Sequence, residues 1–199
     1  GPTLLDVLAR SGRRAVVVNV PGTYPASAVA GVMISGFVAV NLERAVHPPE
    51  LLPKLKQAGY KIDVDYIRAN ERPEEFFRDL FDTLDARRRV LVELARDEAW
   101  DVFIGVFTET DRLHHYFWHA WEDESCPYHD RFVEFYSRLD EALGELLEIL
   151  DGVPTMVLAD HGHMLIDSEF YPNVWLREHG LLEYRTEKPR TVTDIASAT

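Results

Sequence analysis

The sequence predicts an α/β fold with a mainly parallel sheet flanked by helices. A β-branched run at residues 14–20 and apolar runs at 101–107 and 154–160 indicate short buried strands. Two long segments, residues 72–100 and 127–150, instead repeat apolar side chains every three or four positions, which is the spacing of one buried helical face. Because helices of this length alternate with short buried strands, a parallel sheet covered by helices is the expected architecture.

Shorter elements are marked by local signals. Residues 47–60 have prolines in the first turn and a glycine near the end, which are ordinary start and stop signals of a helix. Residues 30–37 are small and apolar, and their pattern favours neither a helix nor a strand. The other expected elements are helices at residues 4–10 and 174–179, and strands at 61–65 and 182–185.

The composition bounds the class of protein. The chain has 199 residues, of which 46% are hydrophobic and 28% charged, as in a folded globular protein with one sizeable core. We therefore expect a single α/β domain over residues 1–199. The formal net charge of −13 argues against binding a nucleic-acid polymer, which needs a basic surface. A phosphate-ester substrate stays open, because bound divalent cations can reverse the local charge.

Cysteine content and hydropathy indicate the compartment. Cys126 is the sole cysteine, so the chain has no internal disulfide framework, which fits a reducing environment. No uninterrupted apolar run in the sequence approaches the roughly 20 residues that span a bilayer. We expect a cytoplasmic protein with no membrane partner.

Two motifs directly follow predicted strands and carry chemistry. In "TETDRLHHYFW" (residues 108–118), Asp111 and His115 are four positions apart, so a helix there would place both on one face. In "ADHGH" (159–163), Asp160 and His161 are adjacent at the expected strand end. Carboxylates and imidazoles are ligands of zinc, manganese and iron.

The position of the two motifs strengthens this interpretation. A single aspartate–histidine pair in a loop is usually solvated or hydrogen-bonded, but ligands in parallel α/β sheets bind beyond the carboxyl ends of the strands. Both pairs are expected at that edge, which predicts a metal site. His114 and His163 have a weaker case, as contacts to a substrate or as residues that support the ligands.

Four motifs in a fixed order resemble a known family. They are "NVPGTYPASAVAGVMISGF" (19–37), "FTETDRLHHYFW" (107–118), "LADHGHM" (158–164) and "FYPNVWLREHGLLEY" (170–184). Together they resemble the alkaline phosphatase superfamily, specifically its type I phosphodiesterase/nucleotide pyrophosphatase branch. The resemblance implies two divalent metal ions, zinc or manganese. It makes Asp111 and His115 ligands of one ion, and Asp160 and His161 ligands of the other.

The resemblance also implies an activity. The expected function is a metal-dependent phosphohydrolase that acts on a small phosphate ester through a serine or threonine phosphoenzyme, with metals roughly 4 Å apart stabilising the attacking and leaving oxygens. In the family pattern, an early aspartate and the nucleophile come upstream of the "TYP" segment, and a last histidine ligand comes after the present end. We therefore expect an internal fragment of a longer phosphohydrolase, inactive by itself, with the catalytic nucleophile outside it.

Two alternatives remain open. A phosphotransferase of the cofactor-independent phosphoglycerate mutase kind resembles this pattern in its metal ligands. The chain could also be a non-catalytic metal-binding or interaction module. A serine or threonine nucleophile upstream would separate an enzyme from a module, and substrate assays would separate a hydrolase from a mutase.

Overall fold

The computed structural model describes residues 1–67 and 69–183. These fall into two compact units, Gly1–Met164 and Leu165–Thr199. The first unit contains the sheet and the longer helices, and the second contains α6 (Pro172–Glu178), which confirms the short helix expected there. The expectation of one domain over all 199 residues stays a prediction.

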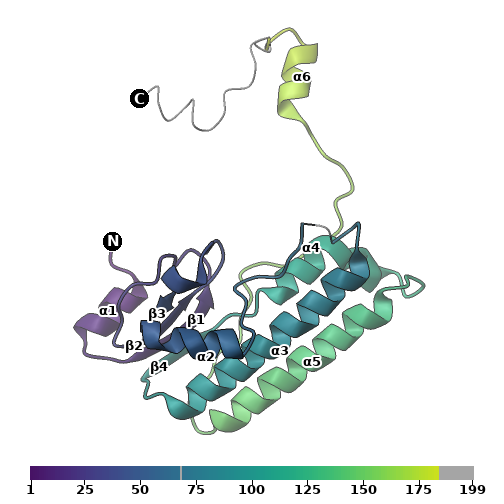
Figure 1. The fold of residues 1–199 in the computed structure, drawn as a ribbon. Coiled ribbons are helices and arrows are strands. Elements are labelled where there is room, and N and C mark those ends of the chain that lie inside the picture. The colour runs from purple at the N-terminus through teal and green to yellow at the C-terminus, as the bar shows by residue number, and fades with distance from the viewer. Residues whose placement is uncertain (68, 184–199) are drawn as a thin grey trace. The chain divides into compact units, whose positions relative to one another are not determined.

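A four-stranded sheet forms one side of the first unit (Figure 1). Its strands are β1 (Ala15–Val20), β2 (Gly31–Ser35), β3 (Val46–His47) and β4 (Val102–Gly105), in the spatial order β3-β2-β1-β4. β1 pairs in parallel with β2 and β4, whereas β3 runs antiparallel to β2. The predicted mainly parallel α/β sheet is therefore confirmed, and β1 is central because its valine run is buried on both faces.

The side chains of β1 alternate between two cores. Val16 and Val18 pack with Leu55 of α2 (Leu52–Gln57) and with the C-terminal half of α3 (Pro73–Asp97). Val17 points to the opposite face, where it packs with residues of α1 (Leu4–Arg10). This alternation follows from the two-residue period of a strand. Two short 3₁₀ turns interrupt this part of the chain: η1 (Leu42–Arg44) between β2 and β3, and η2 (Pro49–Leu51) between β3 and α2.

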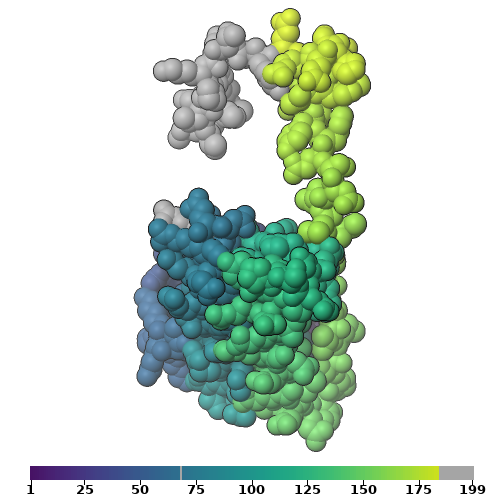
Figure 2. Space-filling view, turned by 90° about the vertical axis from the view of Figure 1, so that its right-hand side faces the viewer, coloured from purple at the N-terminus to yellow at the C-terminus, as the bar shows by residue number. Residues whose placement is uncertain are grey.

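Three helices form a layer beside the sheet. α3, α4 (Glu109–Glu122, kinked at Phe117) and α5 (His129–Ile149) lie next to one another in Figure 1, and α4 and α5 cover one side of the unit in Figure 2. The two long predicted helices are confirmed. Their apolar stripes meet in a second core, where Phe77 of α3 and Phe135 of α5 are fully buried. α5 contacts α3 and α4 more than the sheet, which corrects the expectation that its stripe packs on the sheet itself.

Two strand predictions are wrong. Residues 61–65 form no strand, because side chains satisfy their backbone groups: Arg87 donates to the carbonyls of Lys61 and Ile62, and the amide of Asp65 donates to Asp79. Residues 154–160 also form no strand. Their apolar side chains are exposed, and among the described residues the sheet ends at β4, with which this segment does not pair.

The remaining expectations concern the ends of the elements and the membrane. The strand expected at 182–185 extends past the described residues, which stop at 183. Residues 30–37, which the pattern left unassigned, contain β2. Gly31 is required there because a Cβ would lie 2.1 Å from the carbonyl oxygen of Ala15. Within residues 1–67 and 69–183, no helix has both the length and the apolar character needed to cross a bilayer.

Candidate metal centre

The turn from β4 into α4 sets the position of the first motif. Asn19, at the end of β1, is fully buried and has a positive φ of 64°. Its side-chain amide donates to the hydroxyl of Thr108 (3.0 Å) and to the carbonyl of Val106 (3.3 Å), which ties the end of β1 to the start of α4. α4 then begins at Glu109, so Asp111 lies in its first turn. The helix that the sequence predicts directly after the strand is confirmed.

Three histidine side chains converge on one carboxylate oxygen. Oδ1 of Asp111 lies 3.3 Å from Nε2 of His115, one turn further along α4. Nε2 of His161 and Nε2 of His163 each lie 3.6 Å from the same oxygen. The segment after residue 158 thus brings two imidazoles to the start of α4, although it forms no strand. Ligand atoms of Asp111, His161 and His163 lie within 4.8 Å of one another, close enough to share one ion.

Asp160 lies at the rim of this cluster. Its side chain is 89% exposed, and its Oδ1 lies 3.8 Å from Nε2 of His161. The sequence predicts two ligand pairs, Asp111 with His115 and Asp160 with His161. The structure instead gathers His115, His161 and His163 around Asp111 and leaves Asp160 outside. Which of these residues bind metal stays a prediction.

His163 and His114 form a partly buried pair behind the cluster. Their Nδ1 atoms lie 3.0 Å apart, and Nε2 of His114 lies 2.6 Å from the hydroxyl of Tyr136. Burial, with a smaller contribution from His163, lowers the pKa of His114 to about 4, and burial also lowers the pKa of His163. Both rings are therefore neutral near pH 7. In a pair of neutral rings, the Nδ1–H of one ring donates to the Nδ1 of the other. If His163 is the donor, its proton is on Nδ1, and its Nε2 therefore keeps a free lone pair.

The cluster fits a divalent cation. Nε2 of His163 is buried and has no hydrogen-bond partner among the described residues, although it faces Asp111. Buried polar atoms are normally paired, so a missing partner at this position calls for an explanation. Imidazole nitrogens with one carboxylate oxygen are a donor set that zinc accepts. A cation held by Asp111 and the histidines would satisfy this nitrogen.

Two ion pairs, one fully buried and one partly buried, lie beside Asp111, and sequence reasoning missed both. Glu109 accepts a 2.7 Å hydrogen bond from Nε of Arg87, and both side chains are fully buried. Arg112 binds Asp63 through Nε (3.0 Å) and Nη2 (2.5 Å). A signal for the first pair was present: Arg87 falls in the apolar stripe of α3, between Leu84 and Leu91, where a charged side chain needs a buried partner. No comparable signal marks Asp63.

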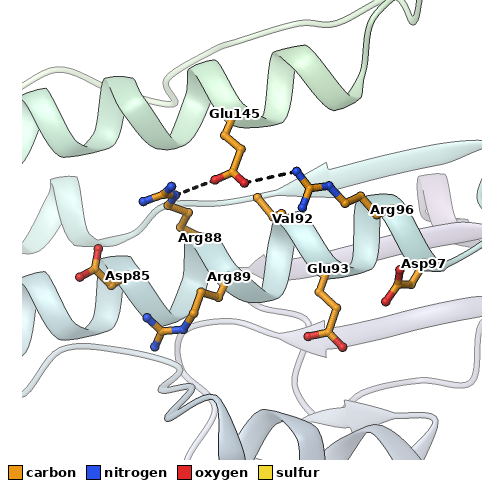
Figure 3. A pocket seen from close by; sticks show the side chains of 8 residues that line it. All are labelled: Asp85, Arg88, Arg89, Val92, Glu93, Arg96, Asp97 and Glu145. Carbon is orange, nitrogen blue, oxygen red and sulfur yellow. Dashed lines mark hydrogen bonds and ion pairs between the residues drawn. The ribbon is translucent and has the colours of Figure 1, made fainter.

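A separate hollow lies on the surface between α3 and α5 (Figure 3). Its volume is about 440 Å³, and Glu145 accepts hydrogen bonds from Arg88 and Arg96 across it. The other lining residues are Asp85, Arg89, Val92, Glu93 and Asp97. Acidic and basic side chains alternate here, and no histidine of the cluster lines this hollow.

The fold and the cluster define an α/β protein with a candidate metal centre at the start of α4, directly after the edge strand β4. Comparison with known families is more specific: the sequence model described as type I phosphodiesterase / nucleotide pyrophosphatase matches residues 1–198. The chain belongs to this family, which confirms the resemblance to the alkaline phosphatase superfamily. The family is one of phosphoester hydrolases, is typically metal-dependent and acts on small phosphate esters. Neither the curated proteins nor the solved structures compared with the chain gave a match.

Proposed function

We propose that this chain carries metal ligands of a phosphohydrolase of the phosphodiesterase/nucleotide pyrophosphatase type. One observation carries the proposal: three imidazole nitrogens lie within 3.6 Å of one oxygen of Asp111. A shared cation would attract all four groups, because a carboxylate oxygen and imidazole nitrogens are ligands that zinc and manganese accept. Family membership supports the same chemistry.

The position of each residue in the cluster suggests its role. Asp111, His115 and His161 would hold divalent cations, zinc or manganese, together with His163, whose Nε2 faces the same oxygen, and with Asp160 joining at the exposed rim. A bound cation there supplies stabilisation of the charge that develops on the phosphoryl oxygens. The proposed reaction goes through a serine or threonine phosphoenzyme on a small phosphate ester. Thr23 is not assigned as that nucleophile, because its hydroxyl donates to the carbonyl of Val20 at 2.7 Å within a turn.

The proposal is tested by titrating zinc and manganese into the chain by calorimetry. Asp111→Asn and His161→Ala are each expected to weaken binding at least about tenfold, because each removes one ligand. The matched control is His119→Ala, since His119 lies on the same helix but outside the cluster. Equal affinities for Asp111→Asn and His119→Ala would refute the metal centre.

Activity separates the remaining alternatives. In the full-length protein, Asp111→Asn is expected to abolish hydrolysis of bis(p-nitrophenyl) phosphate while His119→Ala retains it. A protein that binds zinc but moves a phosphoryl group only within one substrate would be a mutase-like phosphotransferase. Zinc binding with no turnover of any phosphate ester would indicate a metal-binding module.

A further inference from the structure

We propose that Arg112 and Asp63 form a clamp that fixes the orientation of Asp111. The inference rests on the proposed function, because the orientation of Asp111 matters chemically when this carboxylate is a metal ligand. Arg112 and Asp63 are positioning residues in this scheme, since they act on the centre through Asp111 alone. Two sets of contacts support the clamp: the hydrogen bond from Arg112 to one oxygen of Asp111, and the contacts that fix Arg112 itself.

Arg112 occupies the oxygen of Asp111 that the histidines leave free. Its Nη1 donates to Oδ2 of Asp111 at 3.2 Å. The histidine nitrogens all approach the other oxygen, Oδ1, with His115 nearest at 3.3 Å. A carboxylate can rotate about its last torsion and exchange its two oxygens. A guanidinium bound to Oδ2 prevents this exchange, so Asp111 presents Oδ1 alone and would bind a cation through one oxygen.

Arg112 is itself held rigidly. The carboxylate of Asp63 accepts from Nε at 3.0 Å and from Nη2 at 2.5 Å, which is the two-pronged geometry that a guanidinium favours. The guanidinium also lies over two aromatic rings, 4.6 Å from the ring centre of Phe37 and 4.4 Å from that of Tyr66. The Arg112 side chain is 11% exposed. Such a planar, shielded group has one well-defined position.

The other half of the clamp is anchored in the core. Asp63 follows Lys61 and Ile62, whose carbonyls accept hydrogen bonds from the buried Arg87 of α3 at 3.2 and 3.0 Å. The backbone next to Asp63 is therefore fixed to α3. The line of contacts runs from α3 through this segment to Arg112 and ends on Asp111. Partners that orient a ligand in this way typically change metal affinity by about 10–100-fold when they are replaced.

The test measures zinc affinity in variants of the clamp. Arg112→Lys keeps the charge but loses the fork, and Asp63→Asn keeps the shape but loses the charge. Both are expected to weaken zinc binding at least about tenfold. The double variant is expected to be little weaker than either single variant, because the two residues act as one unit. Imidazole ¹⁵N spectra of His115 and His161, recorded during the titration, show whether the same ligands still respond.

A matched pair elsewhere on the molecule controls for the loss of an ion pair as such. Arg138 of α5 also lies over an aromatic ring, 4.5 Å from the centre of Phe81, and pairs with Asp85 at 3.7 Å. Arg138→Lys and Asp85→Asn are expected to leave zinc affinity unchanged. Thermal unfolding is recorded for every variant, and Asp63→Asn decides the outcome if Arg112→Lys does not fold.

The outcomes separate the clamp from the centre. If the unmodified chain binds zinc and both clamp variants bind it with the same affinity, the clamp is overturned and the proposed function stays intact. No zinc-dependent change of any histidine signal in the unmodified chain would overturn the metal centre, and the clamp with it. Clamp variants that lose affinity only as much as Arg138→Lys and Asp85→Asn would show a general electrostatic effect and also refute the clamp.

Discussion

Arg87 tests what the buried polar network contributes to stability. Its side chain is fully buried in α3, and Nε donates to Glu109 at 2.7 Å. Nη1 donates to the hydroxyl of Tyr60 at 2.6 Å, and Nη2 donates to the carbonyls of Lys61 and Ile62. Arg87→Met keeps a long apolar stem and a good helix former but removes every one of these donors. Glu109 is then left as a buried carboxylate without its partner.

The expected loss is large. Removing one member of a buried ion pair typically costs about 3–5 kcal/mol, because the other charge stays desolvated. The whole free energy of unfolding of a domain is only about 5–15 kcal/mol. The neighbouring Arg88→Met is the matched control: Arg88 pairs with Glu145 at the surface, where the two side chains are 40% and 28% exposed. Pairs of that kind contribute about 1 kcal/mol or less.

Urea denaturation followed by far-UV circular dichroism gives the free energy of unfolding of each variant. The Arg87→Met,Glu109→Met double variant is measured as well. It is expected to be more stable than Arg87→Met alone, because it leaves no unpaired charge. Equal losses for Arg87→Met and Arg88→Met would refute the reasoning, as would a double variant that is no more stable than Arg87→Met alone.

Two further predictions concern buried side chains in the two cores on this side of the sheet. Burial raises the pKa of Tyr60 to about 12. The folded chain therefore keeps the phenol proton where the unfolded chain loses it, and stability that is full below pH 10 should fall by up to about 3 kcal/mol between pH 10 and 12. The fall should be smaller in Tyr60→Phe, and parallel pH curves would contradict this. Leu139→Ala in α5 should cost about 2–5 kcal/mol, since Leu139 is 8% exposed. Leu147→Ala, at a side chain 47% exposed, should change stability by about 0.5 kcal/mol or less.

Periodicity made most of the fold predictable. The valine run of β1 reflects a strand that is buried on both faces. The spacing of three and four residues in α3 and α5 reflects helices that each bury one face. Such patterns extend over many residues, so one polar exception such as Arg87 does not hide them. The position of α4 was also predictable, because "TDRLHHYFW" follows an apolar strand directly.

The failures occurred where side chains replace backbone partners. Residues 61–65 alternate like a strand, yet Arg87 and Asp79 bind their backbone groups, and no local pattern reveals contacts from distant residues. At the candidate site, spacing indicated which residue types gather but not how the chain turns around Gly162. The structure brings His163 next to Asp111 and leaves Asp160 at the exposed rim, and the metal ligands named from the sequence stay a prediction.

The ion pairs of Glu109, which is fully buried, and of Arg112, which is partly buried, raise the question of why charges are retained beside the cluster. Apolar residues of similar volume would often give equal or greater stability, so stability is a weak reason to keep buried charges. Geometry is a stronger reason. Glu109 and Arg112 stand on either side of Asp111 in the first turn of α4, and each is bound to a residue outside that helix. An apolar stripe permits small shifts and rotations of a helix, whereas two directional ion pairs hold its first turn in one place.

The Arg87→Met,Glu109→Met variant separates the two explanations, stability and geometry. It should recover most of the stability lost in Arg87→Met, but its zinc affinity should stay below that of the unmodified chain. Recovery of both would show that the pair has no part in orienting Asp111.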